Sequence, residues 1–295
     1  MTARLINEGN LCYFMRIAIV SSDKDPAGHA IHSVLAKIHS LQSLGIFLHL
    51  IDRELLQADN LEKTIPADHF IFASKHRSSS NTKSFAVHSI GNFADPNAGG
   101  MAGTLCPSPA LLQREIFLSL QNRRREGYEV TMEATHHGPY TAVPSVFVEV
   151  GSTQEEWEDV ENARIIAESI LEGLSQYLIA NTKHPNTDDP EKTDKNQNNR
   201  VKTAIGIGGP HYCNNFNKLV SRKNYAIGHI CPKHHLDKLD EAMLRQAIKK
   251  TVGKVDAIIL DWKGLGQEKA RLLEILQSIG LPIERTDQIL KERDF

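Results

Sequence analysis

The apolar positions of the chain follow two repeats, one typical of buried strands and one typical of amphipathic helices. Short runs rich in β-branched and aromatic residues, bounded by polar residues, predict strands. Apolar residues spaced three or four positions apart predict helices. The predicted strands cover residues 16–21, 47–52, 70–74, 85–90, 128–131, 145–150, 202–207, 225–231 and 257–261, and the predicted helices cover residues 29–44, 109–124, 155–178, 241–252 and 267–279. This alternation predicts an α/β fold with a mostly parallel, twisted sheet flanked by helices.

Two segments interrupt the pattern. Residues 181–200 contain no large apolar residue and cannot bury enough surface to become ordered, so we expect a mobile insertion there. A fresh strand pattern begins after Met15, and we expect residues 1–14 to be a loose extension or to lie upstream of the true start codon. The insertion falls inside the α/β pattern, so residues 15–295 are expected to form a single domain.

Composition excludes few functions but limits how a nucleic acid could be bound. The 295 residues are 40% hydrophobic and 24% charged, with a formal net charge of −2, so any RNA contact must come from a local patch. The four cysteines form no CxxC pair, which fits free thiols in a reducing compartment. No apolar run approaches the length of a membrane span. We therefore expect a cytoplasmic monomer that makes no membrane contact.

Histidine placement is the unusual feature of the sequence. Several of the fourteen histidines lie within or just after predicted strands, namely His76, His88, His136, His137, His211, His229, His234 and His235. In an open parallel sheet the carboxyl ends of the strands form one edge, where ligands bind. We therefore expect a shared polar cleft at that edge. A single strand histidine is more often a satisfied core residue, and this is our interpretation of His49 and His69.

The stretch EATHHGP at residues 133–139 concentrates the candidate chemistry. Glu133, His136 and His137 place three titratable groups within five residues, which need partners or a ligand. Such groups either bind zinc, with one position left for water, or act as general acid and base without a metal. The pattern is not HExxH, so its spacing alone secures no metal motif. The stretch GIGG at 206–209 precedes a proline and is not a dinucleotide fingerprint, but its backbone N–H groups could face an oxyanion or a phosphate.

Seven motifs occur in one order along the chain. They are SSDKDPAG at 21–28, KHRS at 75–78, HSIGN at 88–92, EATHHGP at 133–139, PSVFVEVGSTQEEW at 144–157, GIGGPHY at 206–212 and GHICPK at 228–233. Each is weak alone, but together they are specific, and the chain resembles the D-aminoacyl-tRNA deacylases of archaea and plants. The resemblance runs from about Met15 to near the C-terminus and skips the insertion. After GIGGPHY the chain has Cys-Asn-Asn-Phe-Asn at 213–217, where the family usually continues with Pro and then Phe-Thr.

The resemblance implies a phosphorylase/hydrolase-like fold, near that of peptidyl-tRNA hydrolase, and a hydrolase activity. The family cleaves the ester between a D-amino acid and the terminal ribose of tRNA, which releases both and serves chiral proofreading. It implies aminoacylated tRNA as partner, contacted at its acceptor end, and zinc as cofactor, with two ions per subunit. On the matching positions we predict catalytic roles for His136, His137, Lys75 and His76, substrate binding by Asp25, Gly28, His88, Asn92, Glu149, Gly209, Tyr212 and Lys233, and metal binding by His136, His137, His211 and His229.

An ester is already activated, so such an enzyme needs a positioned water, a base and an oxyanion partner. A histidine of the 136–137 pair is the candidate for the water, and Lys75 or an amide of Gly208–Gly209 for the developing charge. Lys75, Arg77 and Lys233 are candidates for phosphate contacts, and residues near Gly99–Gly100 or Tyr140 are candidates for the pocket that reads chirality.

Two alternative functions remain open: a zinc-dependent amidohydrolase or peptidase of small substrates, and a non-catalytic RNA-binding protein. The net charge and the lack of an aromatic–basic stripe weigh against the second.

Overall fold

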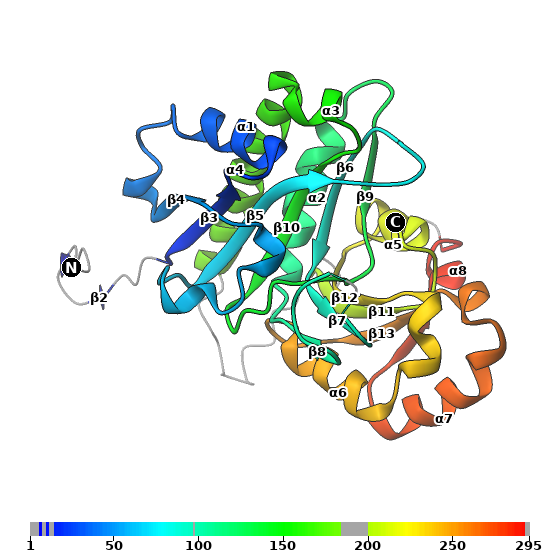
Figure 1. Cartoon of the computed structure of the whole chain (residues 1–295). Helices are drawn as coiled ribbons and strands as arrows, with labels where there is room; N and C mark the ends of the chain where they lie inside the picture. Colours follow the sequence, from blue (N-terminus) through cyan, green and yellow to red (C-terminus); the bar gives the residue numbers. More distant parts are fainter. Residues whose placement is uncertain (1–5, 8–9, 12–14, 97, 184–199, 293–295) are drawn as a thin grey trace.

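The computed structural model describes residues 6–7, 10–11, 15–96, 98–183 and 200–292 (Figure 1). The expected extension at 1–14 lies largely outside the described residues, as does most of the expected insertion at 181–200, so both stay predictions, as does the single domain. The prediction of a mixed α/β fold with mostly parallel strands flanked by helices is confirmed. The strands are divided between two larger sheets, which the strand pattern alone did not indicate.

The larger sheet has six strands in the order β4-β3-β5-β10-β6-β9. Their bounds are Ile17–Ser22 for β3, Ile46–Ile51 for β4, His69–His76 for β5, Ser84–Ser89 for β6, Glu129–Met132 for β9 and Ser145–Gly151 for β10. Neighbouring strands pair in parallel, except that β10 pairs antiparallel with β6. The inner strands are buried on both faces, which explains why they read as continuous apolar runs.

The smaller sheet has four parallel strands in the order β12-β11-β13-β14. Their bounds are Lys202–Ile207 for β11, Tyr225–Cys231 for β12, Ala257–Leu260 for β13 and Ile283–Arg285 for β14. Strand β14 was not predicted because its three residues contain a single apolar side chain. Two short antiparallel pairs complete the described strands: β1 (Ile6–Asn7) with β2 (Asn10–Leu11), and β7 (Gly91–Asn92) with β8 (Thr104–Leu105).

The described α-helices are α1 (Pro26–Leu35), α2 (Ala110–Asn122), α3 (Gln154–Glu158), α4 (Val160–Lys183), α5 (Asn214–Arg222), α6 (Glu241–Lys250), α7 (Lys269–Ile279) and α8 (Thr286–Ile289). Each predicted helix is present with different ends, and the helices α5 and α8 were not predicted. Helix α1 begins before the predicted residue 29 because Asp25 caps it, accepting a hydrogen bond from Gly28 N, and proline occupies the first turn. The long helix predicted at 155–178 is broken at Asp159, whose backbone is extended. Among the described residues, no helix has the length and apolarity to cross a membrane.

The two faces of the larger sheet contact different layers. On β5, Ile71 and Ala73 belong to the core that contains the buried faces of α1, α2 and α4. Phe70 and Phe72 point the other way, into a second core with residues from the connection that follows β4. Because side chains alternate along a strand, Ser74 and His76 continue this second face. The face thus changes from aromatic to polar along β5.

Buried polar contacts join the two larger sheets. Ser89 Oγ, on β6, donates a hydrogen bond to Gly228 O of β12 at 2.9 Å. The segment that follows β9 also reaches the smaller sheet, because Ala134 N donates to His211 O and Thr135 N donates to Ile230 O. The loop between β11 and α5 is therefore held against the polar face of the larger sheet.

Candidate active site

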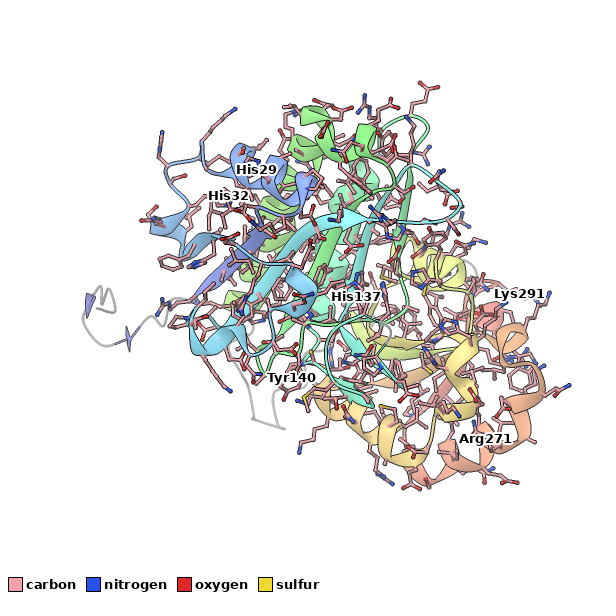
Figure 2. All side chains as sticks on the ribbon, viewed as in Figure 1. His29, His32, His137, Tyr140, Arg271 and Lys291 are labelled. Atoms are coloured by element: carbon pink, nitrogen blue, oxygen red, sulfur yellow. The ribbon has the colours of Figure 1, made fainter. Side chains whose placement is uncertain are left out.

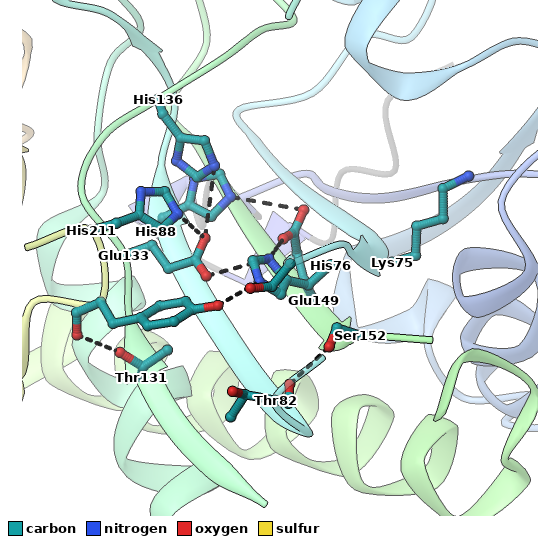
Figure 3. Close-up of polar contacts among 12 residues, drawn as sticks. Lys75, His76, Thr82, His88, Thr131, Glu133, His136, Glu149, Ser152 and His211 are labelled. Atoms are coloured by element: carbon teal, nitrogen blue, oxygen red, sulfur yellow. Dashed lines mark hydrogen bonds and ion pairs between the residues drawn. The ribbon is translucent and has the colours of Figure 1, made fainter. Parts of the chain in front are cut away.

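A cluster of imidazoles and carboxylates occupies the polar part of this sheet face (Figure 3). Its members are His76, His88, Glu133, His136, His137, Glu149 and His211, and we call it the histidine–glutamate cluster. Six of the seven come from the larger sheet and the segment after β9, and His211 comes from the β11–α5 loop. Figure 2 shows His137 near the middle of the molecule, whereas His29 and His32 lie on α1, apart from it.

Glu133 is the centre of the cluster. Its carboxylate is fully buried, with Oε1 3.3 Å from His76 Nδ1, and Oε2 3.4 Å from His211 Nε2 and 3.7 Å from His136 Nε2. Neither oxygen accepts a hydrogen bond from a described residue. A buried carboxylate without a donor is costly, and such groups in native proteins usually have a catalytic or ligand-binding role.

His76 compensates the negative charge at the floor of the cluster. Its Nδ1 lies 3.3 Å from both Glu133 and Glu149, and its Nε2 lies 3.2 Å from the hydroxyl of Tyr212. Burial alone would lower the pKa of His76, but Glu149 and Glu133 raise it to about 10. Burial alone would raise the pKa of Glu149, but the His76 and His88 imidazoles hold it well below its usual value. The His76–Glu149 pair is therefore ionised at neutral pH.

Three other histidines are each locked in one orientation by a backbone carbonyl. The Nδ1 of His88 lies 3.1 Å from Ser89 O, that of His136 2.8 Å from Ala134 O, and that of His137 2.6 Å from Gly138 O. A carbonyl can only accept, so each Nδ1 carries the proton and each Nε2 presents a lone pair when the ring is neutral. Metal-binding histidines are oriented in the same way by their second nitrogen.

Two of these histidines are held neutral. Burial, followed by the adjacent His88, His137 and His211, keeps the pKa of His136 well below its usual value. Burial and then His88 lower the pKa of His137 to about 4. Burial alone would lower the pKa of His88, but its interactions with Glu149 and Glu133 raise it above the usual value. Neutral imidazoles beside buried carboxylates are the protonation states that a divalent metal requires.

The donor set fits a metal ion. Three overlapping groups of ligand atoms lie within 4.8 Å of one another: His88 with His136 and His137, Glu133 with His136 and His211, and His76 with Glu133 and Glu149. The Nε2 of His88 and both oxygens of Glu133 have no hydrogen-bond partner among the described residues. Nitrogen and oxygen ligands in such groups are those that zinc binds in catalytic sites.

The structure brings most of the predicted histidines together, but His229 is not among them. His229 is buried in β12, with Nδ1 3.3 Å from Thr135 Oγ1, and it belongs to none of the potential metal groups. We expected a cleft at the carboxyl edge of the sheet, whereas His88 and Glu149 lie within β6 and β10. The cluster therefore occupies a sheet face, with loops contributing the remaining ligands.

Several predicted substrate-binding residues organise the loops around the cluster. Asp25 accepts hydrogen bonds from Ser74 Oγ and Lys75 N as well as capping α1. A Cβ at Gly28 would lie 2.7 Å from Ala73 O, so this position requires glycine for the close approach of α1 to β5. The side chain of Lys75 projects away from the cluster (Figure 3).

The other predicted positions lie on either side of the cluster. The Asn92 side-chain amide donates to Gly99 O and Met101 O. These bonds hold the loop that contains Gly99 and Gly100 against the backbone of Gly138. Across the molecule, Lys233 is exposed, and its backbone N donates to Gly209 O. These contacts show how the loops are held and leave the predicted substrate contacts of these residues as predictions.

From the sequence, Glu133 was grouped with His136 and His137 as candidate chemistry but was not among the predicted catalytic, substrate-binding or metal-binding residues. The available signal was the alternation of β9, which places Thr131 and Glu133 two residues apart, on the face that His88 shares. Thr131 was missed, and Asn217 was noted only as a departure from the family pattern, because their contact joins segments 86 residues apart in the chain.

The chain is similar to known proteins in sequence and in fold. The family model described as D-aminoacyl-tRNA deacylase matches residues 63–284. The D-aminoacyl-tRNA deacylase of Methanocaldococcus jannaschii is 34% identical over 284 residues, covering 92% of this chain and 100% of that protein, and the one of Ignicoccus hospitalis is 30% identical over 270 residues, covering 91% and 99%. The crystal structure of a conserved protein of unknown function, AF0625, is 26% identical and superposes with a TM-score of 0.79 over 94% of this chain and 98% of that one. The chain belongs to the D-aminoacyl-tRNA deacylase family.

Proposed function

We propose that this protein hydrolyses the ester that joins a D-amino acid to the terminal ribose of tRNA, releasing the free amino acid and tRNA. Membership of the deacylase family supports the reaction. The observation that carries the proposal is the buried Glu133 carboxylate, which has three imidazole nitrogens within 3.7 Å and no hydrogen-bond donor among the described residues. Such a group is available to accept a proton from an attacking water.

We further propose that the cluster binds zinc, with two ions per subunit as the family resemblance implies. The group of His88, His136 and His137 is the first candidate site. The group of Glu133, His136 and His211 overlaps it at His136, whose Nε2 has a single lone pair and cannot complete both groups at once. With an ion held by the first group, Glu133 and His211 stay free to transfer protons. When bound, zinc supplies Lewis-acid chemistry, which polarises an ester carbonyl and eases the ionisation of water.

The chain's own groups divide the proton transfers. Glu133 Oε2 accepts the proton of the attacking water. His211 Nε2, 3.4 Å from that oxygen on a side chain that is 38% exposed, relays the proton to the departing ribose oxygen. His76 remains charged and keeps the neighbouring Glu149 ionised, which fixes the floor of the site during the reaction.

The acceptor end of tRNA is the proposed partner, contacted by a few local cations. Lys75 and Arg77 flank His76 in the sequence, and the backbone N of Lys233 donates to Gly209 O, two residues before His211, so basic residues occur on the segments around the cluster. A tRNA substrate implies a cytoplasmic location. The monomeric state and the roles of Gly99–Gly100 and Tyr140 in reading chirality stay predictions.

A paired substrate assay tests the proposal. D-tyrosyl-tRNA and L-tyrosyl-tRNA are incubated with the full-length chain, and release of the amino acid is followed. We expect hydrolysis of the D ester only, and loss of the activity after treatment with a chelator, with zinc measured by elemental analysis. Equal rates on both esters, or hydrolysis of small amides in place of either, would favour the amidohydrolase alternative. A tight tRNA complex without turnover would favour the RNA-binding alternative.

A further inference from the structure

Two polar residues that take no part in the proposed proton transfers join helix α5 to the larger sheet beside the cluster. Asn217 lies in α5 and Thr131 lies in β9, the edge strand of the larger sheet. Asn217 Nδ2 donates to Thr131 Oγ1 at 2.8 Å and to Tyr212 O at 3.0 Å, and Asn217 Oδ1 accepts from Met132 N at 2.8 Å. Thr131 Oγ1 also lies 2.6 Å from Tyr212 O. We call these four hydrogen bonds the Asn217 latch.

The latch fixes the loop that completes the cluster. His211 and Tyr212 are adjacent in this loop, and both backbone carbonyls are held by the larger sheet and the segment after it: His211 O by Ala134 N, and Tyr212 O by the latch. From this position the Tyr212 hydroxyl reaches His76 Nε2 at 3.2 Å, and His211 reaches Glu133 at 3.4 Å. Both contacts join the β11–α5 loop to residues of the larger sheet and of the segment after β9.

Attachment of α5 does not depend on the latch. The helix buries Phe216, Leu219 and Val220 in the apolar core that also contains residues of β11 and β12. Three large buried side chains contribute several kilocalories per mole, whereas a single neutral side-chain hydrogen bond contributes about 1 kcal/mol. The latch therefore determines where the loop lies more than whether the helix packs.

We propose that Asn217 is a positioning residue for deacylation, which acts by holding Tyr212 and His211 in register with His76 and Glu133. The inference rests on the proposed function. The latch touches neither the cations offered for tRNA binding nor Glu133 itself, so its loss is expected to lower kcat more than it raises KM. A displacement of about 1 Å in groups that act on the reaction typically costs up to about 100-fold in rate.

The test compares variants in steady-state hydrolysis of D-tyrosyl-tRNA by the full-length chain. Asn217→Ala is expected to lower kcat about 10- to 100-fold with KM within about twofold of wild type. Tyr212→Phe removes one of the groups that the latch places, so the loss of kcat in the double variant is expected to be smaller than the product of the two single losses. Asn214→Ala, at an exposed asparagine of the same helix, is the matched control and retains the wild-type kcat.

A second pair of variants separates positioning from general packing. Thr131→Val removes the latch hydroxyl at nearly constant volume, whereas Thr131→Ser retains it. Only the valine variant is expected to lower kcat, by about tenfold. If Asn217→Ala does not fold, Asn217→Asp takes its place, because it keeps the size and the acceptor for Met132 N and removes both donors.

Three results would overturn the inference: wild-type kcat in the Asn217 variant, losses at Asn217 and Tyr212 that multiply, or equal kcat in the valine and serine variants of Thr131. Each requires an active wild type. A wild-type protein that does not hydrolyse D-tyrosyl-tRNA would instead overturn the proposed function, and the inference with it.

Discussion

Strand β5 begins with one buried histidine and ends with another, and the two lie in opposite electrostatic environments. His69 and His76 are 6% and 5% exposed, so burial does not distinguish them. His69 Nε2 contacts the Tyr177 hydroxyl at 3.1 Å, and burial lowers its pKa to about 4. Burial alone would also lower the pKa of His76, but Glu149 and Glu133 raise it to about 10. The carboxylates, which arrive from β10 and from the segment after β9, turn one end of the strand into a site.

The largest effect is expected from removing the charge on which the site depends. Glu133→Gln keeps the shape of the side chain but removes the proton acceptor and a candidate metal ligand, so kcat should fall about 1,000-fold. Metal content, measured by elemental analysis, should fall with it. Glu129→Gln, at an exposed carboxylate of the same strand region, is the control and should be unchanged. Full activity in the Glu133 variant would place the chemistry elsewhere.

The sequence predicted the centre of β5, at residues 70–74, and placed His69 in the core, because both depend on local spacing. His69 is buried as expected, but only its Nε2 has a hydrogen-bond partner among the described residues. The division into two sheets and the antiparallel pairing of β6 with β10 were not predicted, because short apolar runs carry no information about their neighbours. The central role of Glu133 was missed for a similar reason: its partners His76 and His211 are 57 and 78 residues away in the chain. The two-residue period of a strand does predict part of the site, because it places Phe70, Phe72, Ser74 and His76 on one face.

The next effect concerns stability at the site end of β5. His76→Gln leaves Glu149 and Glu133 buried without their cation, and breaking a buried ion pair from one side typically costs about 3 kcal/mol or more. We expect a loss of about 3 kcal/mol in the free energy of unfolding at pH 7, measured in urea, together with reduced turnover. An unchanged unfolding midpoint would mean that another cation neutralises the two carboxylates.

The smallest effect is expected at the other end of the strand and appears only in acid. A histidine whose folded pKa is lowered from 6.5 to about 4 takes up a proton on unfolding at intermediate pH, so its contribution to stability is present above pH 6.5 and is lost as the pH falls toward 4. Between pH 7 and pH 5 this loss amounts to about 2 kcal/mol.

His69→Gln removes the titration and can still contact the Tyr177 hydroxyl, so its unfolding free energy should fall about 2 kcal/mol less than that of wild type over this interval. Deacylation by this variant at pH 7 should match wild type, since His69 lies at the opposite end of β5 from the cluster. Parallel pH profiles of the two proteins would show that the pKa of His69 is the same in the folded and unfolded states. The two ends of β5 would then differ less in electrostatic environment than the burial of His69 implies.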